Sequence, residues 1–138
     1  MRCLYCYNPE IVFGKGTIEF SAVLSFLNTR KGLLDAVVFS GGECTIHKNI
    51  IEQIKQVKAM GFLVKIDTNG SKPALLKQWI ASNLIDYVAL DFKSHPGKFH
   101  SITKSNLFEP FLETLQLLTL SKIAFEVRTT YHSDLLEE

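Results

Sequence analysis

The stretch Asp35-Ala-Val-Val-Phe-Ser-Gly-Gly-Glu43 decides the fold of this 138-residue chain. Residues 35–40 form a short continuous apolar run, which is typical of a strand buried on both faces of a parallel sheet. Two glycines and a glutamate follow directly, so a charged group stands at the carboxyl end of that strand. In parallel α/β proteins, binding and catalytic groups gather at this end of the strands. The stretch therefore predicts one strand of a parallel sheet with a polar site at its end.

Three further runs resemble the first one, and segments with apolar residues at helical spacing precede each of the four. We expect the other strands at 62–67, 87–92 and 123–128. We expect helices over 20–27 before Gly32, 50–57 before Gly61, 75–80 after Pro73, and 108–118. Helix and strand thus alternate four times, which predicts an α/β fold with about four parallel strands. No linker divides the chain, so we expect residues 1–138 to form a single domain.

Composition narrows the class of protein further. The chain is 46% apolar and 21% charged, and 15 Lys and Arg against 14 Asp and Glu give a net charge of +1. A chain so close to neutral has no overall positive electrostatic field that would attract nucleic acid or an anionic membrane. The longest apolar runs have five or six residues, far fewer than the roughly 20 of a membrane span. Met1-Arg2 leads straight into a cysteine without an apolar signal region. We therefore expect a cytoplasmic domain with neither nucleic acid nor membrane as partner.

The other three predicted strands also end in polar groups. These ends read Asp67-Thr-Asn-Gly70, Asp91-Phe-Lys93 and Arg128-Thr-Thr130. Because parallel strands end at one edge of a sheet, we expect their side chains to share a pocket with Glu43. Three carboxylates and two basic groups suit a zwitterion, since carboxylates accept from ammonium and Arg or Lys donates to carboxylate. The two glycines before Glu43 would let the backbone approach that ligand closely.

Cys3 and Cys6 form a Cys-x-x-Cys pair, and a third cysteine, Cys44, follows the two glycines. An odd number of cysteines argues against a disulfide framework. Three uses of the pair remain open on spacing alone. A redox pair needs a tightly bracketing strand and helix, zinc needs a second pair of ligands, and an iron–sulfur cluster with one open iron needs three cysteines. We expect Cys44 to be a buried small side chain.

Four motifs taken together resemble a radical S-adenosylmethionine (SAM) enzyme. They are Cys3-Leu-Tyr-Cys6-Tyr-Asn-Pro, Phe39-Ser-Gly-Gly-Glu43, Ile66-Asp-Thr-Asn-Gly70 and Leu90-Asp-Phe-Lys93. The chain is most similar to the activating enzymes of glycyl radical proteins, and among these to the activases of anaerobic ribonucleotide reductase. The likeness runs in order along nearly the whole chain, and the motifs are specific in combination.

The resemblance implies a [4Fe-4S] cluster held by Cys-x-x-x-Cys-x-x-Cys. Cys3 and Cys6 match its second and third cysteines, and the first would fall just before Met1. Addition of a short segment that restores a cysteine four residues before Cys3 is expected to be needed for stable cluster binding. Tyr5 matches the aromatic residue that lies near the adenine of SAM.

The resemblance also implies roles for the polar groups at the strand ends. Gly41, Gly42 and Glu43 match the motif that holds the methionine ammonium group. Three residues match positions that help to place a monovalent cation near the SAM carboxylate: Asp67, Thr68 and Asp91. Two match basic residues that line the pocket: Lys93 and Arg128.

The implied fold is a partial (β/α)6 barrel, of which this chain would hold the second to fifth strands in a domain incomplete at both ends. The implied chemistry is reductive cleavage of SAM to methionine and a 5′-deoxyadenosyl radical, which removes hydrogen from a glycine of a partner enzyme. The implied partners are a glycyl radical enzyme, such as anaerobic ribonucleotide reductase, and a flavodoxin- or ferredoxin-type electron donor. Two alternatives stay open: an enzyme acting on a small molecule, like 7-carboxy-7-deazaguanine synthase, and an inert fragment that only binds SAM.

Overall fold

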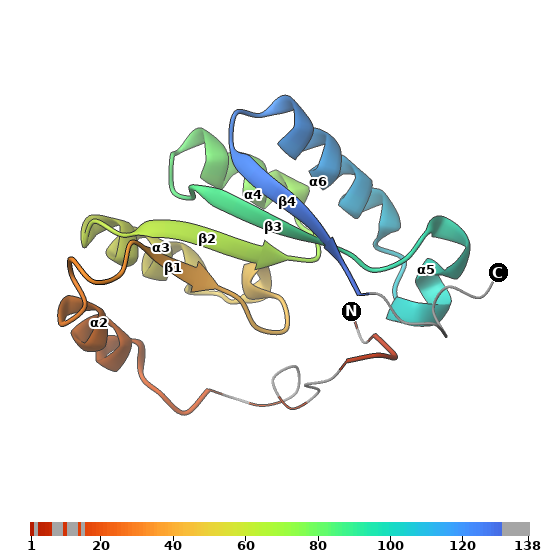
Figure 1. Cartoon of the computed structure of the whole chain (residues 1–138). Helices are drawn as coiled ribbons and strands as arrows, with labels where there is room; N and C mark the ends of the chain where they lie inside the picture. The colour runs from red at the N-terminus through yellow and green to blue at the C-terminus, as the bar shows by residue number, and fades with distance from the viewer. Residues whose placement is uncertain (2, 7–9, 11–13, 15, 131–138) are drawn as a thin grey trace.

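A single sheet of four parallel strands organises the protein. In the computed structural model, which describes residues 1, 3–6, 10, 14 and 16–130, the strands follow one another in the order β1-β2-β3-β4 (Figure 1). Their bounds are β1 Ala36–Phe39, β2 Leu63–Thr68, β3 Tyr87–Phe92 and β4 Ala124–Thr129. All three pairings are parallel. The α/β fold with four parallel strands is confirmed, and each strand lies within one or two residues of its predicted bounds.

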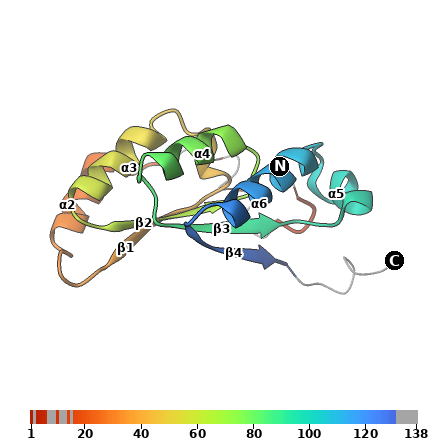
Figure 2. The same cartoon turned by 90° about the horizontal axis from the view of Figure 1, so that it is seen from above.

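Helices connect the strands and cover one face of the sheet. The helices are α2 Phe20–Asn28, α3 Ile50–Ala59, α4 Pro73–Ala81, α5 Pro96–Thr103 and α6 Phe108–Leu120, with a 3-10 turn η1 at Cys44–Ile46. Figure 2 shows α3, α4 and α6 on the same side of the sheet, as right-handed parallel connections require. None of the described helices is long and apolar enough to cross a membrane.

The core lies between this helical layer and the sheet. Side chains that alternate along each strand point into it, so that Val64, Ile66 and Leu90 are fully buried. Trp79 of α4 and Leu118 of α6 meet them from the helical side and are also fully buried. The alternation follows from strand geometry, in which successive side chains point to opposite faces.

The opposite face of the sheet has no helix over it within the described residues (Figure 2). Val38 and Leu63 on this face are each 51% exposed. The prediction that the first strand is buried on both faces is therefore wrong. An apolar residue at every position of a short strand signals two covered faces only where a second layer exists. The uncovered face is the one that carries the charged side chains described below.

Local sequence explains several of the helix ends. Pro73 stands in the first turn of α4, where a missing N–H costs nothing. Gly61 follows α3 with φ +93°, a conformation that favours glycine. Helix α5, which was not predicted from the sequence, begins at Pro96 and ends before Lys104, whose backbone is left-handed. Buried Phe99 and Ile102 hold this short helix in place through tertiary contacts.

Candidate functional site

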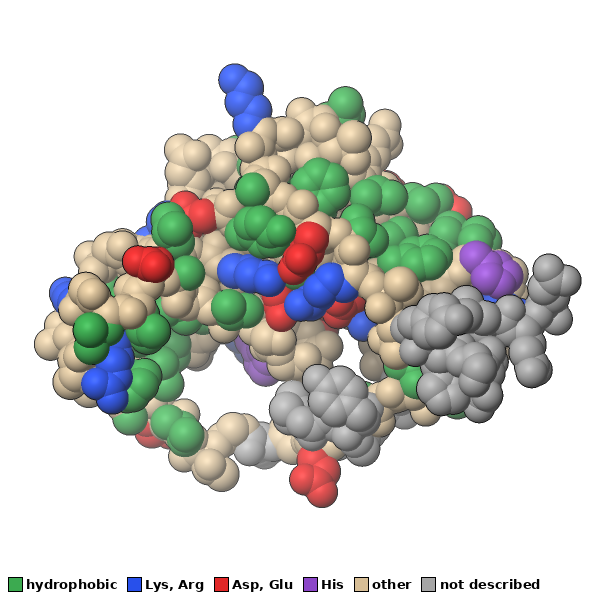
Figure 3. All heavy atoms as spheres, viewed as in Figure 1, with side chains coloured by type: hydrophobic (Ala, Val, Ile, Leu, Met, Phe, Trp, Pro, Cys, Tyr) green, Lys and Arg blue, Asp and Glu red, His purple; other side chains and the backbone are tan. Residues whose placement is uncertain are grey.

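Three charged residues meet at the carboxyl end of the sheet. Asp67 of β2, Asp91 of β3 and Arg128 of β4 lie on the uncovered face, because each is an odd number of residues from a core position of its strand. Asp91 and Arg128 are direct neighbours in the register of β3 and β4. In Figure 3, basic and acidic side chains gather at the centre of this face with apolar side chains around them.

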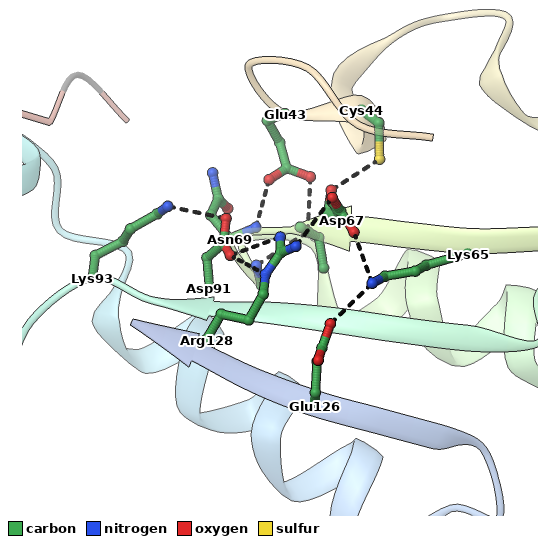
Figure 4. Close-up of polar contacts among 11 residues, drawn as sticks. Glu43, Cys44, Lys65, Asp67, Asn69, Asp91, Lys93, Glu126 and Arg128 are labelled. Atoms are coloured by element: carbon green, nitrogen blue, oxygen red, sulfur yellow. Dashed lines mark hydrogen bonds and ion pairs between the residues drawn. The ribbon is translucent and has the colours of Figure 1, made fainter. Parts of the chain in front are cut away.

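The guanidinium group of Arg128 lies between the two aspartates (Figure 4). Its Nη2 is 3.0 Å from Asp91 Oδ1, to which Nε also donates a hydrogen bond at 3.1 Å. Its Nη1 donates to Asp67 Oδ2 at 3.3 Å. Partial burial alone would lower the pKa of Arg128, but the charge of Asp91 and its hydrogen bond, then those of Asp67, raise this pKa above its usual value. Arg128 is therefore a fixed positive charge between two carboxylates.

Two lysines form further ion pairs, one with each of the two aspartates. Lys93 Nζ lies 3.0 Å from Asp91 Oδ2. Lys65 Nζ lies 2.9 Å from Glu126 Oε1 and 3.9 Å from Asp67 Oδ1. Lys65 and Glu126 were not among the site residues predicted from the sequence. Their signal is the alternation Lys65-x-Asp67 and Glu126-x-Arg128, which places two charges of each strand on one face.

Glu43 lies apart from these ion pairs and ties the loop after β1 to the end of β2. Its Oε1 accepts hydrogen bonds from Thr45 Oγ1 at 2.6 Å and from Thr68 Oγ1 at 2.8 Å. Its Oε2 accepts from the backbone N–H of Asn69 at 2.7 Å. The carboxylate is buried, and these donors replace the water it loses.

Thr68 is separated from Asp67 by the alternation of the strand. It is buried, and its hydroxyl donates to Glu43 while it accepts from the N–H of Gly70 at 3.1 Å. The structure thus does not bring the Thr68 side chain to the two aspartates with which the sequence analysis grouped it. Gly41, with φ +125°, and Gly42 are exposed beside Glu43, and nothing lies within 4 Å of where a Cβ of Gly41 would stand. The backbone of both glycines is therefore accessible to solvent.

The Cys3–Cys6 turn is hydrogen-bonded to the segment that follows β3, beside Lys93. The N–H of Cys6 donates to the Cys3 carbonyl at 3.1 Å, and the N–H of Leu4 donates to the Ile102 carbonyl of α5 at 3.0 Å. Tyr5 Oη donates to the Lys93 carbonyl at 3.2 Å. Sequence-distant segments therefore place the cysteine turn beside the end of β3.

Burial and charge alter the titration of this turn. Burial raises the pKa of Tyr5 to about 12, with further contributions from Cys3 and from Asp91. Burial also raises the pKa of the Cys3 thiol, against which the nearby positive charge of Lys93 acts. Both effects follow from the position of Cys3 and Tyr5 near the Asp91–Lys93 end of the charged site. Cys6 is exposed, and Cys3 is half-buried.

Cys44 has a different environment. It is buried, as predicted, and its Sγ donates to the carbonyl of Asp67 at 3.4 Å. Burial, then the charges of Glu43 and Asp67, raise the pKa of this thiol to about 12. A thiol that resists ionisation is a poor metal ligand. Among residues 1, 3–6, 10, 14 and 16–130, no group of three or more His, Cys, Asp or Glu side chains is arranged to hold a metal ion. Cys3 and Cys6 offer two soft ligands of one turn, which fits part of an iron–sulfur ligand set.

Comparisons of the sequence with known proteins show the family of the chain. The family model of the radical SAM superfamily matches residues 1–133. A protein of Methanocaldococcus jannaschii, MJ1227, whose name describes it as a glycyl-radical enzyme activating enzyme, is 33% identical over 100% of this chain and 60% of its own length. A similarly named protein of Haemophilus influenzae is 31% identical over 51% of this chain and 29% of its own length.

The fold also has solved counterparts. The structure of TYW1 with a lysine-pyruvate adduct bound superposes with a TM-score of 0.64 and 18% identity, covering 93% of this chain and 50% of TYW1. The chain thus spans about half of that structure and 60% of the length of the M. jannaschii relative. The likeness to TYW1 shows the fold alone, whereas the match over residues 1–133 shows the family. The chain belongs to the radical SAM superfamily.

Proposed function

We propose that these residues form part of a radical SAM activating enzyme, an oxidoreductase that places a glycyl radical on a partner enzyme. The observation that carries the proposal is the fastening of the Cys3–Cys6 turn, through Tyr5, to the strand end that bears Asp91 and Lys93. A soft-ligand turn and a site of mixed charge thereby share one end of the sheet. A metal-bound zwitterion such as SAM needs both together.

Each residue has a proposed role in this site. Cys3 and Cys6 would hold two irons of a [4Fe-4S] cluster, and Tyr5 would lie near the adenine of SAM. Gly41, Gly42 and Glu43 would hold the methionine ammonium group. Oε2 of Glu43 accepts one hydrogen bond, from the N–H of Asn69, and its second lone pair could accept one from the ammonium group. Lys93 and Arg128 would face the methionine carboxylate. Asp67 and Asp91 would hold these two cations in position.

The cluster, when bound and reduced, supplies the electron that cleaves the C5′–S bond of SAM. This chain's residues bind and orient the methionine end of SAM. The names of the relatives from M. jannaschii and H. influenzae support a glycyl radical enzyme as partner, and we propose one of the anaerobic ribonucleotide reductase kind. A flavodoxin or ferredoxin would supply the electron. Two free thiols, one half-buried and one exposed, suit the reducing, anaerobic cytoplasm.

Anaerobic reconstitution tests the proposal. Two residues, Cys-Xaa, are added before Met1 to complete Cys-x-x-x-Cys-x-x-Cys, and the protein is incubated with iron and sulfide. We expect a brown protein that releases 5′-deoxyadenosine from SAM after reduction, whereas the unextended chain loses its iron. Replacement of Cys3 or Cys6 by Ala should abolish the colour, and C44A should retain it. A folded but colourless extended protein would overturn the radical SAM activity proposed here.

A further inference from the structure

We propose that Arg128 takes the place of a metal cation between Asp67 and Asp91, so that this site needs no K⁺ or Na⁺. The resemblance to activating enzymes implies a monovalent cation held by Asp67, Thr68 and Asp91. The described residues do not fit that cation. This role of Arg128 rests on the SAM-binding function proposed above, but it can be tested in the absence of SAM and of the cluster.

The guanidinium of Arg128 already joins the two carboxylates. It contacts Asp91 Oδ1 through Nη2 at 3.0 Å and Asp67 Oδ2 through Nη1 at 3.3 Å. A cation shared by Asp67 and Asp91 would have to lie where these two nitrogens lie (Figure 4). A guanidinium is planar and permanently charged, and its fork of donors matches two carboxylates. Arg128 therefore occupies the bridging position.

The third proposed cation ligand lies elsewhere. The hydroxyl of Thr68 is buried on the other side of β2, where it donates to Glu43 Oε1 at 2.8 Å. Successive side chains of a strand point to opposite faces, so the Thr68 hydroxyl cannot join Asp67 without a change of the strand itself. Of the side chains in the expected ligand set, only the two carboxylates remain, and they already share a guanidinium.

The surrounding charges also disfavour an added cation. Along the uncovered face the charges alternate in one row: Glu126, Lys65, Asp67, Arg128, Asp91 and Lys93. Three carboxylates and three cations balance within this row. Oδ1 of Asp67 is buried and accepts no hydrogen bond from a described residue, but the ammonium of Lys65 lies 3.9 Å from it. A metal ion at this oxygen would meet Lys65 on one side and Arg128 on the other.

Arg128 still has N–H donors that a ligand could use. A guanidinium has five N–H donors, of which Nε donates to Asp91 and Nη1 to Asp67, while Nη2 lies 3.0 Å from Asp91 Oδ1. Its side chain is 40% exposed. The remaining donors can bind the carboxylate of a zwitterion directly, where a metal ion would otherwise act as the bridge.

The test measures cation binding by the protein alone. Thermal unfolding is followed in KCl, NaCl and choline chloride at equal ionic strength, and ²⁰⁵Tl⁺ NMR measures direct binding with Tl⁺ as a probe for K⁺. We expect the wild-type melting temperature to differ by less than about 1 °C between the salts and the Tl⁺ signal to show no saturable binding. Saturable binding to the wild type that D67N removes would overturn the proposal.

Variants test whether the guanidinium is the group that replaces the cation. R128M leaves Asp67 and Asp91 without it, so K⁺ or Na⁺ should raise the melting temperature above that in choline by more than about 3 °C. The double variant R128M/D67N should lose this effect. K65M is the matched control, because it removes a neighbouring cation of the same row that does not bridge the two aspartates. A folded R128M that gains no cation effect would contradict the proposal, and if R128M does not fold, the wild-type measurements decide.

The two proposals fail separately. A colourless reconstituted protein would overturn the radical SAM activity and leave the cation measurement intact. Cation-dependent stability of the wild type would overturn the role of Arg128 and leave cluster formation and SAM cleavage untouched.

Discussion

Glu43 is a buried carboxylate whose hydrogen-bond donors all come from two segments, its own 3-10 turn and the end of β2. Thr45, Thr68 and Asn69 donate to it. A buried charge is tolerated only where such donors replace water. The same bonds fix the position of the Gly41-Gly42 backbone relative to Asp67. In the proposed site, Glu43 would therefore act in two ways, through its own free lone pair and through the loop that it holds.

Replacement of Glu43 by Ala is expected to destabilise the fold and weaken SAM binding while the cluster is retained. Four donors of Thr45, Thr68 and Asn69 lose their acceptor. Each lost bond costs about 0.5–1.5 kcal/mol, so the free energy of unfolding should fall by about 2–6 kcal/mol. Chemical denaturation measures the fall, and calorimetry with the reconstituted protein measures SAM affinity. E113A, at an exposed position on α6, is the control. Unchanged SAM affinity in a folded E43A protein would contradict the role of Glu43.

Because the Cys44 thiol is buried, we expect the free energy of unfolding to fall at alkaline pH. Its thiol has a pKa of about 12 in the folded chain against 9.0 ordinarily. Above pH 9 the unfolded chain therefore binds fewer protons than the folded chain, and the stability that is full below pH 9 falls until about pH 12. The slope approaches about 1.4 kcal/mol per pH unit for one proton.

The comparison of wild type with C44A isolates this effect. The free energy of unfolding is measured by urea titration from pH 7 to pH 11, and the wild-type curve should fall more steeply than that of C44A above pH 9. Parallel curves would show that the thiol ionises equally in both states. Bulky thiol reagents at pH 8 should label exposed Cys6 well before Cys44.

Sequence reasoning located most of the charged residues but not their partners. That Asp67, Asp91 and Arg128 share one end of the sheet follows from strand order alone. That Arg128 bridges both aspartates depends on register and side-chain length, which periodicity does not contain. The separation of Thr68 from Asp67 was predictable in principle, because adjacent strand residues face opposite ways. The motif grouped them because they are neighbours in sequence.

Among the elements, the turn between β2 and α4 packs closely against β3 and α6. Gly70 has φ +75°, and a Cβ there would lie 2.8 Å from Leu90 Cδ1 and 3.3 Å from Cα of Phe111. Thr114 of α6 donates to the Gly70 carbonyl at 2.8 Å. This turn thus joins the strand end that carries Asp67 to the helix that covers β3. A glycine is required here both by conformation and by space.

G70A is expected to cost clearly more than G61A. Both glycines have positive φ, for which a Cβ costs about 1–2 kcal/mol, but nothing lies within 4 Å of a Cβ at Gly61. The crowding of Leu90 and Phe111 adds about 1–3 kcal/mol at Gly70. Chemical denaturation of the two variants gives the difference directly. Equal losses would mean that α6 can move away from the turn without cost.

The elements that sequence reasoning missed or misread share a cause. α5 begins with Pro96-Gly97 and contains polar residues between Phe99 and Ile102, so its apolar spacing is too short to identify. Its burial comes from contacts with distant segments, among them the cysteine turn. The first strand looked buried on both faces because Val37 and Val38 are both apolar, yet only one face carries helices. In both cases the missing information was tertiary.

At the scale of the whole molecule, the two features proposed to bind the cofactors are joined across the length of the chain. Tyr5 and Lys93 are 88 residues apart in sequence, as their hydrogen bond shows. The segment around Leu4 contacts α5, which follows β3 directly. The sheet thus carries the polar site. The thiols of Cys3 and Cys6 lie beside that site only if the contacts of Leu4 and Tyr5 with distant residues form. Docking of the cysteine turn is the step on which the whole site depends.

Titration of Tyr5 tests that docking in solution. In the docked turn, burial and the neighbouring Cys3 and Asp91 raise the pKa of Tyr5 to about 12, whereas a tyrosine of an undocked turn keeps the ordinary value of 10.0. The ultraviolet absorbance of tyrosinate is recorded against pH for the wild type and for Y5F, and their difference isolates Tyr5 from the other tyrosines. We expect this difference to rise well above pH 10, toward 12, while circular dichroism reports that the fold is retained. A midpoint near 10 in a folded protein would mean that the Cys3–Cys6 turn does not rest on the end of β3, and the joint site for cluster and SAM would then lack its structural basis.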